Sequence, residues 1–326
     1  MTTPLGLSVV APCFNEEAGL AAFVARMTAA ARSCGVGAFE VILVDDGSRD
    51  RTWPLIQQLS ATYPEVVGVR LSRNHGHQLA VSAGLSLARG DRVLVIDADC
   101  QDPPELVGQM VAQLDQGFDV VFGRRRSRAG ESPFKLATAR LFYRGLAALA
   151  ESDIPVDTGD FRLMSRRIVE RLNAMPERDR FIRGMVAWLG GRQTEILYDR
   201  EARTSGATHY TLAKMLRLAG DGLTSCSVAP LRLATLLAAF GVCVSCLLLV
   251  YALVGFATGH ATPGWTSLAL IVVFFATAQL ICMAIFGEYL GRAYMQAKGR
   301  PLYLIDEIHV ATRPSPPGGP DHAGRG

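Results

Sequence analysis

The sequence predicts an α/β protein with a mostly parallel sheet, followed by segments that meet a membrane. Three observations carry this prediction. Short apolar runs rich in β-branched residues alternate with helix-like segments five times between residues 7 and 123, which is typical of a doubly wound sheet. Acidic residues follow several of these runs, at the sheet edge where open α/β folds bind ligands. Two long uncharged runs occupy the C-terminal third.

The elements follow in order along the first 123 residues. The predicted strands cover residues 7–12, 39–44, 66–71, 92–96 and 119–123. The first predicted helix begins at Glu16 with Asn15 as its cap, and three more cover residues 51–60, 77–88 and 104–115. Pro103 and Pro104 end the extended segment before the last of these helices and favour a helix start there.

The predicted strand at residues 92–96 ends in Asp97-Ala98-Asp99. Side chains two residues apart on an extended segment share a face, so both carboxylates can point at one site. Two close carboxylates repel each other unless a cation lies between them, and Gln101 adds a neutral oxygen. The pattern predicts an Mg²⁺ or Mn²⁺ site formed by Asp97, Asp99 and Gln101. For one such triplet alone, an acidic turn that ends a strand is the simpler explanation.

Two common nucleotide-binding loops are excluded. Gly35 and Gly37 precede a strand, and Glu40 stands where a third glycine would be needed, so no dinucleotide fingerprint is present. No GxxxxGK[ST] loop occurs either. Carboxylates follow the strands instead, and they can accept hydrogen bonds from nucleobase and ribose groups. The net charge of +3 gives no reason to expect nucleic acid as a partner.

Composition points to a reducing compartment and a membrane. Hydrophobic residues make up 49% of the chain, and the mean hydropathy is +0.22. The seven cysteines have no disulfide-framework spacing, so they are interpreted as small apolar residues. The N-terminus lacks a basic stretch followed by an apolar core, and no signal peptide is expected.

Basic residues follow the fifth predicted strand at positions 124–126 and 128. A charge run is often only a solvated surface, but its position at a strand's carboxyl end favours anion binding by Arg124. A predicted helix at residues 133–150 continues the positive charge through Arg140. Asp157 and Asp160 then lie in a predicted Gly-containing turn at residues 157–162.

Residues 233–256 and 267–286 are each long enough to cross a bilayer as a helix. The loop between them contains no Lys or Arg, whereas basic residues flank the pair on both outer sides. The positive-inside rule therefore places both termini and the α/β domain in the cytoplasm, with a multi-pass anchor in the inner membrane. Residues 211–223 combine apolar and basic positions and predict an amphipathic helix on the membrane surface.

Five motifs in order resemble family 2 glycosyltransferases of the GT-A fold. The resemblance is strongest to the polyprenyl-phosphate branch, which includes the bacterial bactoprenol glucosyl- and mannosyltransferases. The motifs are VVAPCFNEE (9–17), VDDGS (44–48), DADCQDPPE (97–105), GDFRLMSR (159–166) and RTSGATHYTLAKMLRLAGDGL (203–223). One departure is Thr208-His209-Tyr210, because the family usually has Ser-Lys-Tyr there, and His209 replaces a permanent cation with a titratable one.

The resemblance implies a binding role for each motif. The nucleotide base and ribose would contact Pro12, Phe14, Glu16, Asp45 and Asp46. The sugar, the diphosphate and the metal would contact Asp97, Ala98, Asp99 and Gln101. A later basic motif would bind phosphate through Arg203.

The implied reaction moves a hexose from a UDP- or GDP-linked sugar to a polyprenyl phosphate at the cytoplasmic membrane face, with inversion at the anomeric carbon. A phosphate monoester has a second pKa near 6, so it needs little help from a general base. Asp160, or else Asp157, would act as the base or orient the acceptor. The acceptor phosphate would be held by Arg124, Arg140, Arg203 and His209.

The resulting domain prediction is a catalytic domain at residues 1–210, an amphipathic segment at 211–230, two membrane helices within 231–290, and a cytoplasmic tail at 291–326. Self-association in the bilayer stays open, but neither predicted span, 233–256 or 267–286, contains a GxxxG motif to support it. Two alternatives stay open. A processive polysaccharide synthase would usually carry a Gln-x-x-Arg-Trp motif, which is missing. A non-catalytic sugar-nucleotide-binding membrane protein would not need the acidic and basic groups together.

Overall fold

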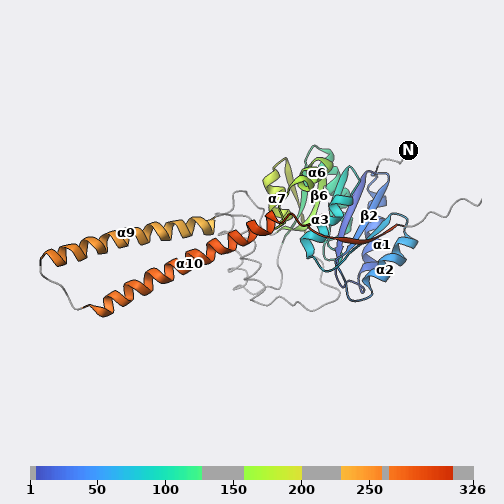
Figure 1. The fold of residues 1–326 in the computed structure, drawn as a ribbon. Helices are drawn as coiled ribbons and strands as arrows, with labels where there is room; N and C mark the ends of the chain where they lie inside the picture. The colour runs from blue at the N-terminus through green and yellow to red at the C-terminus, as the bar shows by residue number, and fades with distance from the viewer. Residues whose placement is uncertain (1–4, 127–157, 200–228, 259–263, 311–326) are drawn as a thin grey trace, which may run out of the picture.

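The computed structural model describes residues 5–126, 158–199, 229–258 and 264–310. It consists of an α/β domain from which a long pair of helices projects (Figure 1). Several predictions lie outside the described residues. They are the helix at 133–150, the amphipathic segment at 211–223, and the site residues Arg140, Asp157, Arg203 and His209.

The strands are β1 (Leu7–Cys13), β2 (Phe39–Asp45), β3 (Val66–Leu71), β4 (Arg92–Val95), β5 (Val120–Arg125), β6 (Thr158–Ser165), β7 (Gln193–Tyr198) and β8 (Ile305–Val310). The helices are α1 (Leu20–Ser33), α2 (Thr52–Thr62), α3 (His77–Leu87), the 3-10 turn η1 (Pro104–Leu106), α4 (Val107–Asp115), α6 (Arg166–Ala174), α7 (Ile182–Leu189), α9 (Ala229–Ala257) and α10 (Trp265–Ala297). The five predicted strands are all present, with ends shifted by at most two residues.

The eight described strands form one sheet in the order β7-β5-β6-β4-β1-β2-β3-β8. β1 lies between β2 and β4 and runs parallel to both. β6 is antiparallel to β4 and β5, and β8 is antiparallel to β3. The prediction of a mostly parallel sheet is therefore confirmed, and β6 inserts one reversed strand beside the strand that carries the acidic motif.

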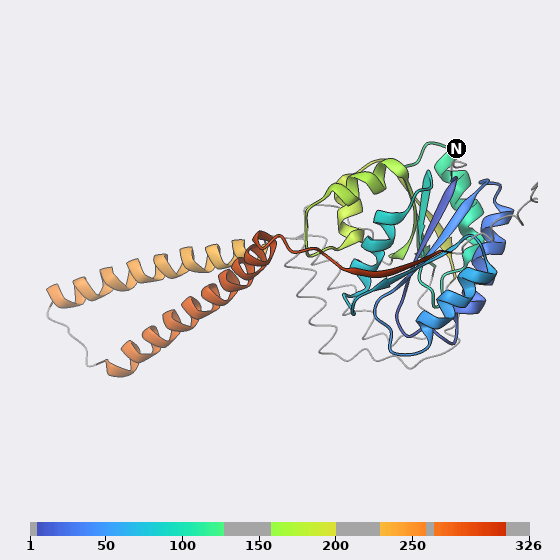
Figure 2. The same cartoon turned by 45° about the vertical axis from the view of Figure 1, so that its right-hand side comes forward.

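Helices cover both faces of the sheet (Figure 2). The reason is visible in β1, where successive side chains point to opposite faces. Leu7, Val9 and Ala11 pack with α1, α2 and α4 on one face, whereas Val10 packs with α3, α6 and α7 on the other. A strand buried on both faces needs a continuous apolar run, and β1 is buried at every position.

Two predictions about local structure are wrong. The first helix begins at Leu20, not at Glu16, and Asn15 does not cap it. Asn15 has a φ of 56° and its side chain binds the loop after β2 instead. The predicted turn at residues 157–162 lies mostly within β6, because Thr158–Ser165 pairs with the strands on either side.

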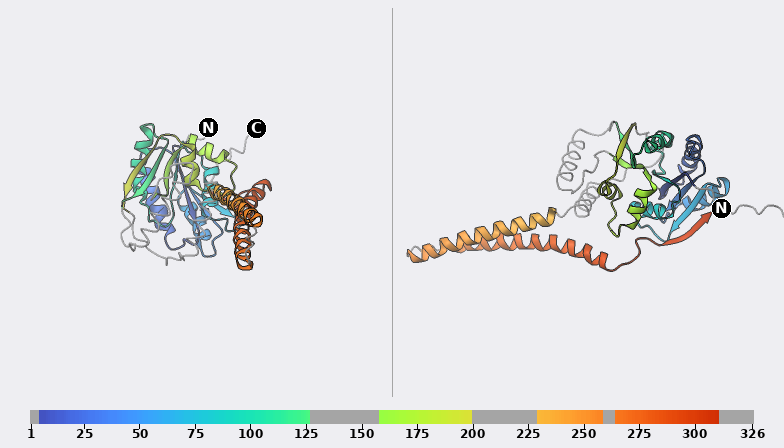
Figure 3. Two further views of the ribbon diagram at one scale, coloured as in Figure 1. Left: turned by 90° about the vertical axis from the view of Figure 1, so that its left-hand side faces the viewer. Right: turned by 90° about the horizontal axis from the view of Figure 1, so that it is seen from above.

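The helices α9 and α10 form a hairpin that stands clear of the α/β domain along most of its length (Figure 3). Among the described residues, one helical segment is long and apolar enough to cross a membrane, Ile271–Ala297 within α10. Its mean hydropathy is 2.0, and the rest of the structure buries none of it. Large apolar side chains on both helices are exposed, among them Leu236, Phe240, Leu247, Leu280 and Phe286. Such a surface is unfavourable in water and suits a lipid environment.

After the hairpin the chain returns to the α/β domain. Leu304 accepts a hydrogen bond from the backbone of Ser72 at 2.9 Å, and the hydroxyl of Tyr303 donates to Ser86 at 2.8 Å. β8 then pairs with β3 at the edge of the sheet. The last described strand is thus contributed by chain that follows the hairpin.

Candidate functional site

The loops that follow β1 and β2 meet at the carboxyl edge of the sheet and are bonded to each other. The backbone N–H of Asn15 donates to Ser48 at 3.0 Å, and the Asn15 side chain accepts from the N–H of Arg49 at 2.9 Å. The N–H of Glu16 donates to the hydroxyl of Thr52 at 2.9 Å. These bonds explain the positive φ of Asn15 and hold two predicted donor-binding loops as one unit.

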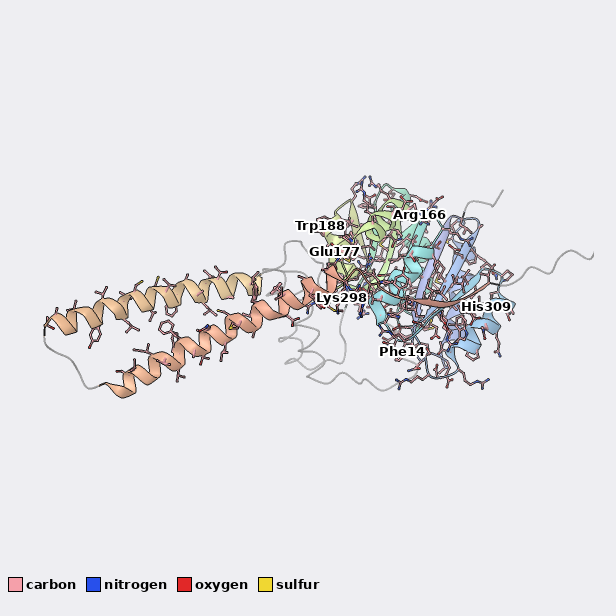
Figure 4. All side chains as sticks on the ribbon, in the orientation of Figure 1. Phe14, Arg166, Glu177, Trp188, Lys298 and His309 are labelled. Carbon is pink, nitrogen blue, oxygen red and sulfur yellow. The ribbon has the colours of Figure 1, made fainter. Side chains whose placement is uncertain are left out.

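Phe14 lies at the carboxyl end of β1 with 44% of its surface exposed, where a planar base can stack on it (Figure 4). Pro12 is buried within β1. Asp45 is fully buried at the end of β2 and accepts the N–H of Ser48 at 3.0 Å. Its other oxygen lies 3.9 Å from Arg70 and has no hydrogen-bond partner among the described residues, so it keeps the capacity to accept a hydrogen bond.

Asp46 binds the start of α3. Its two oxygens accept the backbone N–H groups of His75 and Gly76 at 2.7 and 2.9 Å. Burial raises the pKa of Asp46, although both hydrogen bonds oppose that shift. The predicted donor-binding role of Asp46 stays a prediction, because these bonds already give the carboxylate a structural task.

Gly47 brings the β2 loop against the loop that follows β3. Its φ is 68°, a region that glycine occupies without strain. A Cβ at this position would lie 2.6 Å from the backbone of Arg73 and Asn74. Only glycine therefore fits here.

The acidic motif after β4 contains a carboxylate oxygen that lacks a bond. Asp97 keeps 32% of its side chain exposed, but its Oδ1 atom is buried and has no hydrogen-bond partner in the described structure. Burial raises the pKa of Asp97 to about 6, with His77 opposing the shift and Asp160 adding to it. Asp99 accepts the N–H of Gln101 at 3.1 Å. Ala98 and Gln101 are buried within the same turn.

This donor set fits a divalent cation. His77 Nε2, 3.7 Å from Asp97 Oδ1, offsets part of the repulsion among the nearby carboxylates. A cation beside Asp97 would supply a direct partner and offset the rest. No group of three or more His, Cys, Asp or Glu side chains with metal-binding geometry exists among the described residues. An ion at this site would have Asp97 and Asp99 as protein ligands and would need water and substrate phosphates for its remaining positions, as is usual for Mg²⁺.

Asp160 in β6 sits in a dense set of donors near this motif. Its Oδ2 atom lies 3.0 Å from His77 Nε2 and accepts from Gln78 Nε2 at 2.9 Å. Its Oδ1 atom lies 3.3 Å from Arg183 and 3.9 Å from the buried Arg162. Burial alone would raise the pKa of Asp160, but the His77 hydrogen bond and the two arginines hold it well below its usual range.

His77 connects the two acidic elements. Its Nε2 atom is 3.0 Å from Asp160 and 3.7 Å from Asp97. Burial is the largest single influence on the pKa of His77 and lowers it, but the hydrogen bond to Asp160 and the charges of Asp97 and Asp160 together outweigh burial, so the pKa is raised. His77, Gln78 and Arg183 were not predicted from the sequence as site residues. A signal existed for the first two, because they open a helix at the ligand edge of the sheet.

A second missed group lies on the other side of the acidic motif. Asp102 is 1% exposed, accepts a short hydrogen bond from the hydroxyl of Tyr198, and lies 3.7 Å from Arg125. Arg124, the predicted anion ligand, instead has Glu195 at 2.9 Å on the surface. The structure thus brings Asp97, Asp99, Gln101 and Asp160 together, with the β1 and β2 loops at the same sheet edge. The anion-binding role of Arg124 stays a prediction.

A mostly parallel sheet with helices on both faces and acidic groups at its carboxyl edge defines an α/β protein of the doubly wound class. Residues 8–172 match the family described as glycosyl transferase family 2. The chain belongs to this family, and the prediction of a GT-A-like α/β fold is confirmed.

Relatives match over nearly the whole chain. An uncharacterised glycosyltransferase of Synechocystis is 41% identical over 306 residues, covering 93% of this chain and 95% of the relative. A protein named bactoprenol glucosyl transferase, from Shigella phage SfV, is 34% identical over 300 residues, covering 92% and 97%. Among solved structures, a mannosyltransferase from Pyrobaculum calidifontis in complex with GDP-Man and Mn²⁺ is 19% identical with a TM-score of 0.48, covering 86% and 88%.

Proposed function

We propose that this protein transfers a hexose from a nucleotide-diphosphate sugar to a polyprenyl phosphate at a membrane surface. The observation that carries the proposal is the match, over more than nine-tenths of both chains, to relatives named bactoprenol glucosyl transferase. Bactoprenol is a polyprenyl lipid, and an enzyme that glycosylates it has to work at a bilayer. The apolar, exposed α9–α10 hairpin supports the same setting.

Both helices of the hairpin would cross the inner membrane, with the α/β domain and both termini on the cytoplasmic side. The support is the length of α9 and α10, at 29 and 33 residues, and the absence of Lys and Arg between them. A helix of about 20 residues already spans the hydrocarbon core. A multi-pass anchor would keep the site close to a lipid acceptor.

The donor would bind at the carboxyl edge of the sheet. Phe14 would stack on the base, while Glu16, Asp45 and Asp46, beside Pro12, would accept bonds from base and ribose. Asp97 and Asp99, with Gln101 and Ala98 in the same turn, would hold Mg²⁺ or Mn²⁺ against the diphosphate. When bound, the cation neutralises the charge that develops on the leaving diphosphate.

The acceptor needs orientation more than deprotonation. A phosphate monoester is largely ionised at pH 7 and is already nucleophilic. Asp160, whose pKa is held low by His77, Arg162 and Arg183, is a poor proton acceptor, which supports an orienting role over that of a general base. Asp157 is the other candidate for the base. The acceptor phosphate would be held by Arg124, Arg140, Arg203 and His209.

Purified full-length protein in lipid nanodiscs tests this function. It is incubated with Mn²⁺, a polyprenyl phosphate and each of a panel of radiolabelled UDP- and GDP-sugars, and the lipid is extracted. The expected result is label in a single short lipid product with one preferred donor. Label in a long polymer would favour a processive synthase. Nucleotide binding without transfer from any donor would favour a binding protein.

A further inference from the structure

The C-terminal end of α10 is bonded to the loop between α6 and α7, residues 175–181. Gln296 donates to the carbonyl of Pro176 at 2.7 Å and accepts the backbone N–H of Arg178 at 3.0 Å. Arg292 donates to Asp179 at 2.7 Å. Figure 4 labels Glu177 of this loop and Lys298, the residue directly after α10, in the region where the hairpin meets the α/β domain. The hairpin thus contacts the loop through two hydrogen bonds to the loop backbone and one ion pair, between Arg292 and Asp179.

The same loop leads directly into the site. Ile182 begins α7, and its N–H donates to Gln78 Oε1 at 2.9 Å. The other end of that amide donates to Asp160 at 2.9 Å. Arg183, the next residue of α7, lies 3.3 Å from the second oxygen of Asp160. The seven-residue loop therefore leads directly into α7, where Ile182 contacts Gln78 and Arg183 contacts Asp160.

We infer that Gln78 and Arg183 are positioning residues, and that the end of the membrane hairpin sets their position through the 175–181 loop. Gln78 is suited to this task because its amide has one donor end and one acceptor end, and both are used. A small outward shift of α7 would break the hydrogen bond from Ile182 to Gln78 and move Arg183 away from Asp160. The inference rests on the proposed function, since transfer is the activity that would report the change.

The effect is expected on turnover and not on donor binding. The predicted base and ribose ligands lie on the β1 and β2 loops, which are bonded to each other and to the start of α3. Asp160 and its partners lie on β6, α3 and α7. Loosening α7 should therefore lower kcat and leave the Kd for the nucleotide unchanged.

The experiment uses full-length protein in nanodiscs and three variants: Gln296→Ala, Gln78→Ala and the double variant. Gln58→Ala is the matched control, because Gln58 is an exposed glutamine on α2, away from this contact. Gln296→Ala should lower kcat by about tenfold, the usual scale for a coupling residue remote from a site. The Kd for UDP or GDP in the presence of Mn²⁺ should stay within twofold of wild type, as should every value for the control.

The double variant distinguishes a shared link from two separate defects. If Gln296 acts through α7 and Gln78, its loss should add little once Gln78 is gone, and the kcat of the double variant should equal that of Gln78→Ala. Fold-changes that multiply would contradict the inference. Hydrogen exchange gives a second readout: exchange in peptides covering residues 176–190 should rise in Gln296→Ala, with no rise across β2.

Two further outcomes would overturn the inference. One is faster exchange at residues 176–190 with an unchanged kcat, because α7 would then move without consequence. The other is unchanged exchange, because the hairpin would then not hold the loop. If wild-type protein transfers no sugar from any donor, the proposed function fails, but the exchange measurement still decides whether α10 holds α7.

Discussion

At the scale of single residues, the two acidic groups of the site differ in what surrounds them. Asp97 and Asp99 face each other's charge, and Asp97 has a buried oxygen without a hydrogen-bond partner. Asp160 is surrounded by donors and stays ionised. The first arrangement is costly until a cation binds, whereas the second is complete within the folded chain. Neutralising an aspartate of the acidic motif should therefore lower activity and not stability, whereas neutralising Asp160 should lower the stability of the folded domain.

Asp99→Asn should abolish metal-supported transfer and leave the fold intact. Removing one charge from the proposed cation site lowers repulsion in the metal-free protein but removes a ligand. We expect kcat to fall by at least about 100-fold, since the metal supplies several kcal/mol to the transition state. Wild-type activity should be lost in EDTA and return with Mn²⁺. Near-normal turnover of the purified variant would remove the metal role from Asp99.

Asp160→Asn should destabilise the α/β domain. Arg162 is buried beside it, and burial lowers the pKa of that guanidinium to about 10 even with Asp160 present. Without the carboxylate charge, Arg162 stays buried with its nearest counter-charge removed. We expect the free energy of unfolding to fall by about 3 kcal/mol, measured by denaturant unfolding, with Asp99→Asn as the control. Equal stability of the two variants would contradict this account.

At the scale of elements, the strands that were predicted correctly from the sequence are those whose local residue pattern is enough to specify a strand. β1 to β5 were predicted because each contains a short apolar run, and in β1 and β2, which are buried at every position, that run is continuous. β6 was missed because Thr158, Gly159 and Asp160 have the composition of a turn. Its strand pairing depends on β4 and β5, which are distant in sequence.

The candidate site divides in the same way. Asp97, Asp99 and Gln101 follow one strand and share one turn, so their spacing predicted a common site. The partners of Asp160 come from α3 and α7, more than 20 residues away in either direction. No spacing in the sequence specifies those contacts, since they depend on how the layers pack against the sheet.

The loop after β2 gives an element-scale prediction. Gly47→Ala should destabilise the protein by more than Gly35→Ala. Both glycines have nearly the same φ, 68° and 69°. A Cβ at Gly35 meets nothing within 4 Å, whereas one at Gly47 meets the backbone of Arg73 and Asn74. Gly35→Ala should cost about 1 kcal/mol of unfolding free energy, the strain of the backbone conformation alone.

The further cost at Gly47 should appear as weaker donor binding as well, because the loop it belongs to carries Asp45 and Asp46. Calorimetric titration with UDP or GDP and Mn²⁺ checks this. Equal binding by the two alanine variants would mean that the contact between the β2 and β3 loops does not shape the donor site.

At the scale of the whole molecule, the sheet is completed by β8, a strand that follows the hairpin in the sequence. Truncation after residue 304 removes β8 and leaves the β3 edge unpaired, whereas truncation after Val310 keeps it. Exposed edges pair with other chains. We expect the shorter protein to aggregate and to unfold at a lower temperature, as measured by light scattering and thermal unfolding. Equal behaviour of the two truncations would show that β8 is dispensable.

The position of β8 also has a consequence for biogenesis. The ribosome synthesises β1 to β7 before α9 and α10, and it synthesises β8 only after both helices. The edge of β3 that β8 covers therefore stays unpaired in the nascent domain until both helices of the hairpin have been synthesised. If the hairpin crosses the membrane as proposed, its insertion would come before the sheet of the α/β domain is complete.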